Sequence, residues 1–272
     1  MTTLDRWLLH EGSTRSAALL RILLGLLVWV RWGAWMRPTH SLEGWQLALA
    51  AAFWVSSIGF VLGVQARGMA ALLGGTLLAA YWGEGVFGGH PHLVAHHTYL
   101  LSWSVLLMSL VPCDRSYSVS RWWAVRRAEA QGRPAPAERG AVWGLSLLAV
   151  QVSAVYLWGT YDKLDPAFLS GERLEIIFMA LYTGADYPSL PGFHILCVAA
   201  AWVTVLLEAW LTVALWHPRT RTVSLGLGLA LHLLFYLGMP VHTFSATMAA
   251  LYLAFLDPDA VHRFLDELQG HP

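Results

Sequence analysis

Long apolar runs separated by short polar links recur along the whole chain. About 20 mostly apolar residues cross a bilayer as a helix, and fewer suffice inside a bundle. The runs are Ala17–Met36, Trp45–Val64, Gly68–Trp82, His97–Pro112, Ala141–Tyr161, Phe193–Trp216, Thr222–Met239 and Thr243–Leu256. The third, fourth and last are short enough to be half-length or re-entrant. The pattern predicts an all-α polytopic membrane protein, a bundle of about eight transmembrane helices within a range of seven to nine.

Basic residues are distributed unevenly among the polar links. Six arginines lie between the fourth and fifth spans, in residues 115–140. Loops rich in Arg and Lys stay on the cytoplasmic side of a membrane. With this link inside, eight spans place both termini in the cytoplasm, with 12 basic residues inside and 3 outside. The sequence therefore predicts a multi-pass protein of the cell inner (cytoplasmic) membrane.

The 115–140 link has the composition of an interfacial amphipathic helix. Within it, Ser118–Gln131 mixes two tryptophans with three arginines, a combination that suits an anionic lipid surface. The Pro-rich stretch Gly132–Ala137 ends the helix. We expect residues 1–272 to form a single transmembrane domain with this basic cytoplasmic amphipathic link, and membrane lipid to be its main partner.

Composition narrows the class of protein further. The 272 residues are 57% hydrophobic and only 12% charged, about half the ~25% of an average soluble domain. This excludes a soluble globular enzyme, a disordered chain and a disulfide scaffold. The net charge of zero gives no reason to expect a nucleic-acid partner. Cys113 and Cys197 fall on opposite sides of the expected bilayer, so no intramolecular disulfide is expected.

Ionisable residues from distant spans gather at the expected outer mouth. They are Glu84, His97, Asp162, Lys163, His194 and His242. Ionisable residues at one depth of an apolar bundle are a functional-site hypothesis by default. Four histidines also lie within residues 90–97. Their spacing is compatible with zinc or copper, and a bis-histidine haem is a further alternative, but the absence of cysteine and paired carboxylates nearby favours a flexible loop.

Three ionisable residues fall inside the predicted spans, away from either membrane surface. Glu208 and Arg21 fall at similar depth, and we expect them to form a structural charge pair, because a buried pair costs less than either charge alone. His232 lies in the middle of the seventh span. Three roles remain open for it: a hydrogen-bonded core residue, a quinone or haem contact, or a proton relay.

Arg31 and Lys163 carry charge near the outer mouth. Arg31 is a candidate counter-ion for Glu84 or Asp162, or a ligand for an anion. Lys163 is the single lysine among 17 basic residues. It could be a lysine that extends along a helix end towards the interface. It could instead lie in an apolar, partly dry pocket, lose its proton easily and act as a base near neutral pH.

Three stretches carry a family resemblance. They are His96–Leu101 with Leu110–Ser118, then Gln151–Tyr156 with Lys163–Glu172, and then Glu208, Pro218–Arg221, His232 and Phe255–Pro258. In this order the pattern resembles the HTTM family, the membrane domain shared with the vitamin K-dependent gamma-carboxylases. The resemblance covers nearly the whole chain, and the motif around Lys163 is its most specific part.

The resemblance implies an enzyme with its active site on the outer face. There a reduced vitamin K-type quinol (menaquinol-like) is oxygenated to its epoxide with O2, and the strong base so produced removes a gamma proton from a glutamate, to which CO2 adds. The base-generating lysine of the family maps onto Lys163 and its essential histidine onto His97. The quinone-pocket candidates are Tyr99, His96, Asp162, Trp158, His232, Glu84 and Arg31.

Two departures from the carboxylases leave other functions open. His96 stands where the carboxylases have asparagine, and the lumenal domain that binds propeptides is missing. A carboxylase of this form takes a different substrate or a partner protein that supplies a periplasmic domain. The alternatives are a membrane protein that assists maturation or export of a secreted peptide, as in short bacterial members, and a DoxX-like quinone oxidoreductase subunit.

Overall fold

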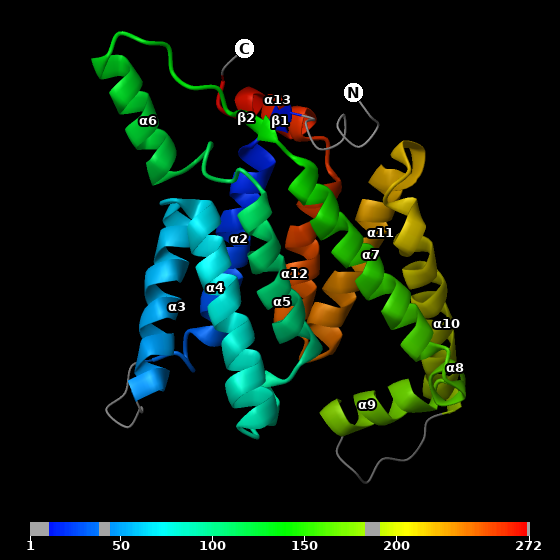
Figure 1. Cartoon of the computed structure of the whole chain (residues 1–272). Coiled ribbons are helices and arrows are strands. Elements are labelled where there is room, and N and C mark those ends of the chain that lie inside the picture. The colour runs from blue at the N-terminus through cyan, green and yellow to red at the C-terminus, as the bar shows by residue number, and fades with distance from the viewer. Residues whose placement is uncertain (1–10, 38–43, 183–190, 271–272) are drawn as a thin grey trace, which may run out of the picture. The chain divides into compact units, whose positions relative to one another are not determined.

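The computed structural model describes residues 11–37, 44–182 and 191–270. The chain forms two compact units (Figure 1). The first unit comprises the chain up to Ala149 together with the C-terminal segment from Thr243. The second unit runs from Val150 to His242. Helix α7, Trp143–Lys163, begins in the first unit and continues into the second.

The first unit is a helical bundle built from the N-terminal spans. Helices α2, α3, α4 and α5 pack against one another, α3 on α4 and α4 on α5 most extensively (Figure 1). The elements up to α5 are β1 Glu11–Ser13, α2 Arg15–Trp32, α3 Gly44–Leu62, α4 Ala66–Ala80, the π-helical turn η1 Tyr81–Phe87, the 3-10 turn η2 Pro91–Leu93 and α5 His96–Leu107. They are followed by η3 Met108–Leu110, α6 Val119–Ala130, β2 Arg139–Ala141, α12 His242–Leu251, η4 Tyr252–Phe255 and α13 Pro258–Leu268.

A glycine sets the close approach of α4 and α5. A Cβ atom at Gly74 would lie 2.6 Å from Leu106 Cβ and 2.7 Å from Leu106 Cα. Because one of these atoms is backbone, a side chain at this position forces the two helices apart. Small residues at helix contacts in membranes allow such close packing.

We expect Gly74→Ala to lower the free energy of unfolding by about 2 kcal/mol, because overpacking a close contact costs roughly 1–3 kcal/mol. The matched control is Gly75→Ala, since a Cβ at Gly75 meets open space. The control should be neutral or stabilising, because alanine is the better helix former. Unfolding in mixed micelles compares the two. Equal stability of the two variants would contradict the close contact.

A small two-stranded sheet connects the segment before α2, the segment before α7 and the C-terminal helix α13. Strands β1 and β2 pair antiparallel, with Gly12 opposite Gly140. Helix α13 packs against β1, and its Asp259 accepts a hydrogen bond from the Ser13 amide at 3.0 Å. Asp259 also pairs with Arg139 at 2.8 Å, which holds the pKa of this carboxyl below its usual value. These bonds fix the C-terminal helix beside the start of α2.

The second unit consists of the remainder of α7 and the elements that follow it. These are α8 Pro166–Leu169, α9 Glu172–Tyr182, α10 Pro191–Ala214 and α11 Pro218–Gly238. A buried cluster joins α8 and α9 to the middle of α10. Gly171 makes this contact possible, because its φ is +81° and a Cβ there would lie 2.6 Å from the Val198 amide nitrogen. The chain therefore turns tightly against α10 after α7 ends.

Among the residues that the structure describes, four helices are long and apolar enough to cross a membrane, namely α3, α7, Gly192–Ala214 of α10, and α11. Helix α11 leaves Leu233 and Leu234 57% and 67% exposed, an arrangement that suits a lipid environment. The expected all-α membrane class is therefore consistent with the structure. A helix lies within each of the eight predicted spans, but α4, α5 and α12 have only 15, 12 and 10 residues. Eight crossings and cytoplasmic termini remain predictions.

Candidate functional site

The single lysine is bonded to a buried carboxylate in the second unit. Lys163 Nζ donates to Glu208 Oε2 at 2.7 Å, to Glu208 Oε1 at 3.0 Å and to the Gly159 carbonyl at 3.2 Å. The side chains of Lys163 and Glu208 are 21% and 6% exposed. A lysine that extends to the interface keeps its charge in water. Lys163 instead folds back along α7 to an acidic partner among the helices.

Helical spacing and one glycine explain this geometry. Tyr156, Gly159 and Lys163 follow the i, i+3, i+7 pattern and share one face of α7. A Cβ at Gly159 would lie 3.1 Å from Glu208 Oε2 and 3.3 Å from Lys163 Nζ. Glycine therefore leaves room for the carboxylate beside the α7 backbone. Glu208 itself lies 17 residues after Pro191, roughly 25 Å along α10 from its start.

A second polar pair lies on the same face of α7. Tyr156 Oη and His232 Nε2 are 2.8 Å apart, and both residues are 2% exposed. His232 comes from the buried side of α11 and lies close enough to Lys163 for their charges to interact. The sequence-based interpretation left a core role, a ligand contact and a relay open for His232. The bond to Tyr156 shows that His232 is a buried, hydrogen-bonded residue of the second unit.

Three helices of the second unit thus supply one polar site. Helix α7 contributes Tyr156 and Lys163, α10 contributes Glu208 and α11 contributes His232. Thr160 adds a buried hydroxyl with no hydrogen-bond partner among the residues that the structure describes. Sequence reasoning did not single out Tyr156 as a site residue or Gly159 as a spacer. The signal that identifies both is their helical spacing from Lys163.

The expected charge pair of Glu208 with Arg21 joins residues of two different units and stays a prediction. Within its own unit each residue has other partners. Glu208 pairs with Lys163, and the fully buried Arg21 donates to the backbone carbonyls of Cys113 and Tyr117 at 2.5 and 2.6 Å. A guanidinium carries five donors, and carbonyl oxygens can accept from them without an acidic partner.

Arg31 also has partners other than the expected carboxylates. Its Nη2 donates to the His92 carbonyl at 2.5 Å and its Nε to Thr98 Oγ1 at 3.1 Å. Glu84 is not among the partners of Arg31 in the described part of the chain, and Asp162 belongs to the other unit. These bonds connect α2 to η2 and α5, so the arginine holds the loop of histidines against the bundle.

Glu84 lies in a small polar cavity of the first unit. It is 4% exposed and belongs to η1, a π-helical turn of the kind often found at functional sites. Gln46 Nε2 donates to Glu84 Oε1 at 3.0 Å, and His90 Nδ1 lies 3.5 Å from Oε2. The cavity has a volume of about 140 Å³, and Trp35 also lines it.

The other predicted residues of the first unit lie on the first turn of α5. His97 is half-buried and close enough to Arg31 for their charges to interact, while His96 is exposed. Tyr99 is 39% exposed and its ring packs 5.3 Å from that of Tyr81. His97 and Lys163 belong to different units, so their expected partnership stays a prediction.

The remaining candidates are exposed residues of the second unit. Trp158 is 67% exposed and packs edge-on against Tyr161. The Asp162 carboxylate is 71% exposed and lies 3.8 Å from Arg173. Surface pairs of this kind contribute little to stability. Within the described residues, neither side chain forms a hydrogen bond with Lys163 or Glu208.

Comparisons with known proteins give one family match. The profile of the HTTM domain matches residues 34–260, a range that includes parts of both units. No curated protein and no solved structure matches the chain. The matched range contains Lys163, His97, Glu208 and His232. The chain therefore belongs to the HTTM family, whose domain is the one found in vitamin K-dependent gamma-carboxylases.

Proposed function

We propose that this protein is a membrane enzyme that oxygenates a quinol to its epoxide, with Lys163 as the base that begins the reaction. The observation that carries the proposal is the ammonium of Lys163 held at 2.7 Å by the buried Glu208 carboxylate. A cation placed among apolar helices is costly, so its retention there favours a chemical role. Membership of the HTTM family supports a carboxylase-like reaction.

The polar groups around Lys163 fit a quinol by their chemistry. A quinol has two hydroxyl groups on an apolar ring, and its pocket needs hydrogen-bonding groups beside apolar surface. The site offers the buried Tyr156 and Thr160 hydroxyls and the His232 ring. We expect Tyr156, Thr160 and His232 to hold the quinol oxygens beside Lys163.

Glu208 gives Lys163 a route to the neutral amine. A lysine acts as a base only after its ammonium has lost a proton. Glu208 can accept that proton directly, because its carboxylate already receives two hydrogen bonds from Nζ. The transfer converts an ion pair into two neutral groups, and neutral groups are far cheaper in a medium of low dielectric constant. The amine of Lys163 then takes a proton from the quinol hydroxyl that it faces.

The reduced vitamin K-type quinol, together with O2, supplies a base strong enough to remove a gamma proton from a glutamate, to which CO2 then adds. The chain's own residues bind, orient and move protons. His97 stabilises the developing anion, and Tyr99 packs at the same turn of α5. The glutamate belongs to a secreted peptide or to a partner protein. The site faces the outside of the cell inner membrane.

The test uses the whole protein reconstituted in lipid nanodiscs. Quinones that co-purify with it are identified by mass spectrometry, and the protein is then supplied with reduced menaquinol, O2 and labelled bicarbonate. We expect bound quinone and formation of the quinone epoxide that depends on Lys163. Labelled carboxylate in an added glutamyl peptide would extend the reaction to carboxylation.

Other outcomes contradict the proposal. Bound quinone that is only reduced or oxidised, with no epoxide, would overturn it in favour of a DoxX-like oxidoreductase subunit. A protein that holds no quinone and turns none over, but binds a small secreted peptide, would overturn it in favour of a maturation or export partner.

A further inference from the structure

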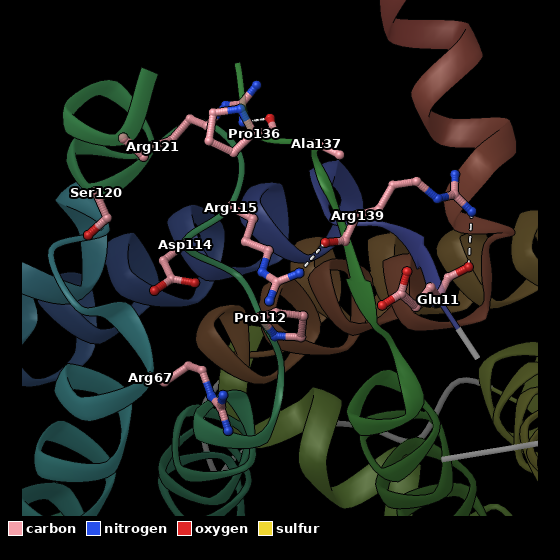
Figure 2. Close-up of a pocket in the computed structure, with 11 residues that line it drawn as sticks. Glu11, Arg67, Pro112, Asp114, Arg115, Ser120, Arg121, Pro136, Ala137 and Arg139 are labelled. Atoms are coloured by element: carbon pink, nitrogen blue, oxygen red, sulfur yellow. Dashed lines mark hydrogen bonds between the residues drawn. The ribbon is translucent and has the colours of Figure 1, made fainter. Parts of the chain in front are cut away.

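A cavity lined by arginines lies in the first unit, whereas the Lys163 site belongs to the second. Its volume is about 660 Å³, within the range of small-molecule sites. Its walls come from β1, β2, the first turn of α4, the link after α5 and the start of α6 (Figure 2). Four guanidinium groups line it, those of Arg67, Arg115, Arg121 and Arg139.

Two of these arginines keep most of their donors available. Arg67 Nε donates to the Ser109 carbonyl at 2.9 Å, and Arg115 Nη1 donates to the Arg139 carbonyl at 2.5 Å. No carboxylate forms an ion pair with either residue in the described part of the chain. Arg121 and Arg139, by contrast, have Glu138 and Asp259 as acidic neighbours. The unpaired guanidinium groups of Arg67 and Arg115 are therefore suited to bind phosphate oxygens.

The cavity also contains carboxylates that could bind a cation. Glu11 and Asp114 line it, and neither forms an ion pair within the residues that the structure describes. Figure 2 shows the side chains of Asp114 and Arg115 among the same lining residues. The charge of Asp114 also interacts with that of Arg21. A lining with groups of both signs fits a zwitterion better than a simple anion, because an anion alone would add negative charge beside these carboxylates.

The surroundings of the cavity indicate a lipid source for such a ligand. Helix α6 supplies Ser120, Arg121 and Ala124 to the wall. Outside the cavity the same helix exposes Trp122 and Trp123, 52% and 60% accessible. Exposed tryptophans beside arginines are typical of the level of the lipid head groups. The cavity therefore opens next to a helix that is suited to contact phospholipid.

We propose that this cavity binds the head group of a phospholipid that carries both a phosphate and a primary ammonium, as phosphatidylethanolamine does. Arg67 and Arg115 bind the phosphate, and Asp114 accepts hydrogen bonds from the ammonium. The proposal is independent of the quinol reaction. It assigns a specific lipid site to a face for which the sequence indicated only general affinity for anionic lipid.

The test measures binding of soluble short-chain phospholipids to the purified whole protein by native mass spectrometry. The probes are dihexanoyl phosphatidylethanolamine, phosphatidylglycerol and phosphatidylcholine, with phosphoethanolamine and inorganic phosphate as lipid-free probes. We expect the ethanolamine lipid to bind about tenfold more tightly than the other two lipids, since each charged hydrogen bond contributes on this scale. Phosphatidylglycerol lacks the ammonium, and the choline group has no N–H to donate.

Variants separate the two halves of the site. Arg67→Gln and Arg115→Gln should each weaken binding of the ethanolamine lipid about tenfold, whereas Arg67→Lys keeps most of it. Asp114→Asn should remove the preference over phosphatidylglycerol while leaving phosphate binding intact. The matched control is Arg133→Gln, an exposed arginine of the same link that does not line the cavity. It should bind as the unchanged protein does.

Three outcomes would overturn the proposal. Equal affinity for all three lipids would show that the cavity does not distinguish between head groups. Binding that is insensitive to both Arg67→Gln and Arg115→Gln would place the lipid elsewhere. Inorganic phosphate or phosphoethanolamine that binds as tightly as the lipid would show that the ligand is a soluble phosphate compound.

Discussion

Replacing Lys163 with methionine is expected to lower quinol-dependent turnover by about 10²- to 10⁴-fold, the usual contribution of a positioned general base. Methionine keeps the length and apolar character of the side chain but has no group that accepts a proton. The protein should still insert and fold, because the apolar part of the side chain is preserved and the Glu208 carboxylate, left without its cation, can bind a proton and become neutral. Epoxide formation in nanodiscs measures the effect.

A second substitution at position 163 keeps the positive charge but removes the ability to act as a base. Lys163→Arg keeps a cation opposite Glu208, but a guanidinium does not release its proton in proteins. It should therefore preserve stability and be as inactive as the methionine variant. Arg173→Gln is the matched control, because Arg173 is an exposed cation of the same unit that lies 3.8 Å from Asp162. Full activity of Lys163→Arg would contradict the role of Lys163 as a base.

The role expected for His97 is tested in the same assay. If His97 and Lys163 act on one quinol, His97→Ala should also abolish turnover, and the double variant should be no worse than either single variant, because residues that act as a unit are strongly non-additive. His96→Ala serves as the comparison, since His96 is the exposed neighbour at the start of α5. Independent, additive losses would place the two residues in separate steps.

The helices were the most predictable part of the molecule. Apolar runs of the right length place a helix in every predicted span, because a bilayer requires its spans to satisfy their own backbone hydrogen bonds. The ends were less predictable. Helix α7 continues to Lys163, two residues past its predicted end, and its lysine is part of the helix rather than of a loop.

The partners of charged residues were not predictable from depth alone. Lys163 was singled out as the only lysine, and Glu208 as a buried acid, but their contact depends on how α7 crosses α10. That crossing depends on Gly159, which leaves space for the carboxylate. Arg21 was expected to pair with Glu208 because both lie deep, whereas two of its donors bond to carbonyl oxygens after α5. Sequence patterns indicate which face of a helix a residue occupies, but they do not indicate which side chain on another helix contacts it.

Removing the acidic partner of Lys163 should affect stability more than any other single change discussed above. We expect Glu208→Leu to lower the free energy of unfolding by about 3 kcal/mol, because breaking a buried pair leaves an uncompensated charge. The estimate lies at the lower end of the usual range, since the Lys163 side chain retains 21% exposure. Unfolding in mixed micelles measures the loss. The matched control is Glu172→Leu, an exposed acid at the start of α9 with no ion pair among the described residues.

The double variant Lys163→Met with Glu208→Leu distinguishes a pair from two separate contributions. Replacing both members of a buried pair with apolar residues of similar volume is often neutral or stabilising. The double variant should therefore recover most of the stability that Glu208→Leu loses, which gives a large coupling energy in a double-mutant cycle. It should remain inactive, because the base is absent. A double variant as unstable as Glu208→Leu would mean that Glu208 stabilises the fold through contacts other than Lys163, and the proton route through this pair would then be wrong.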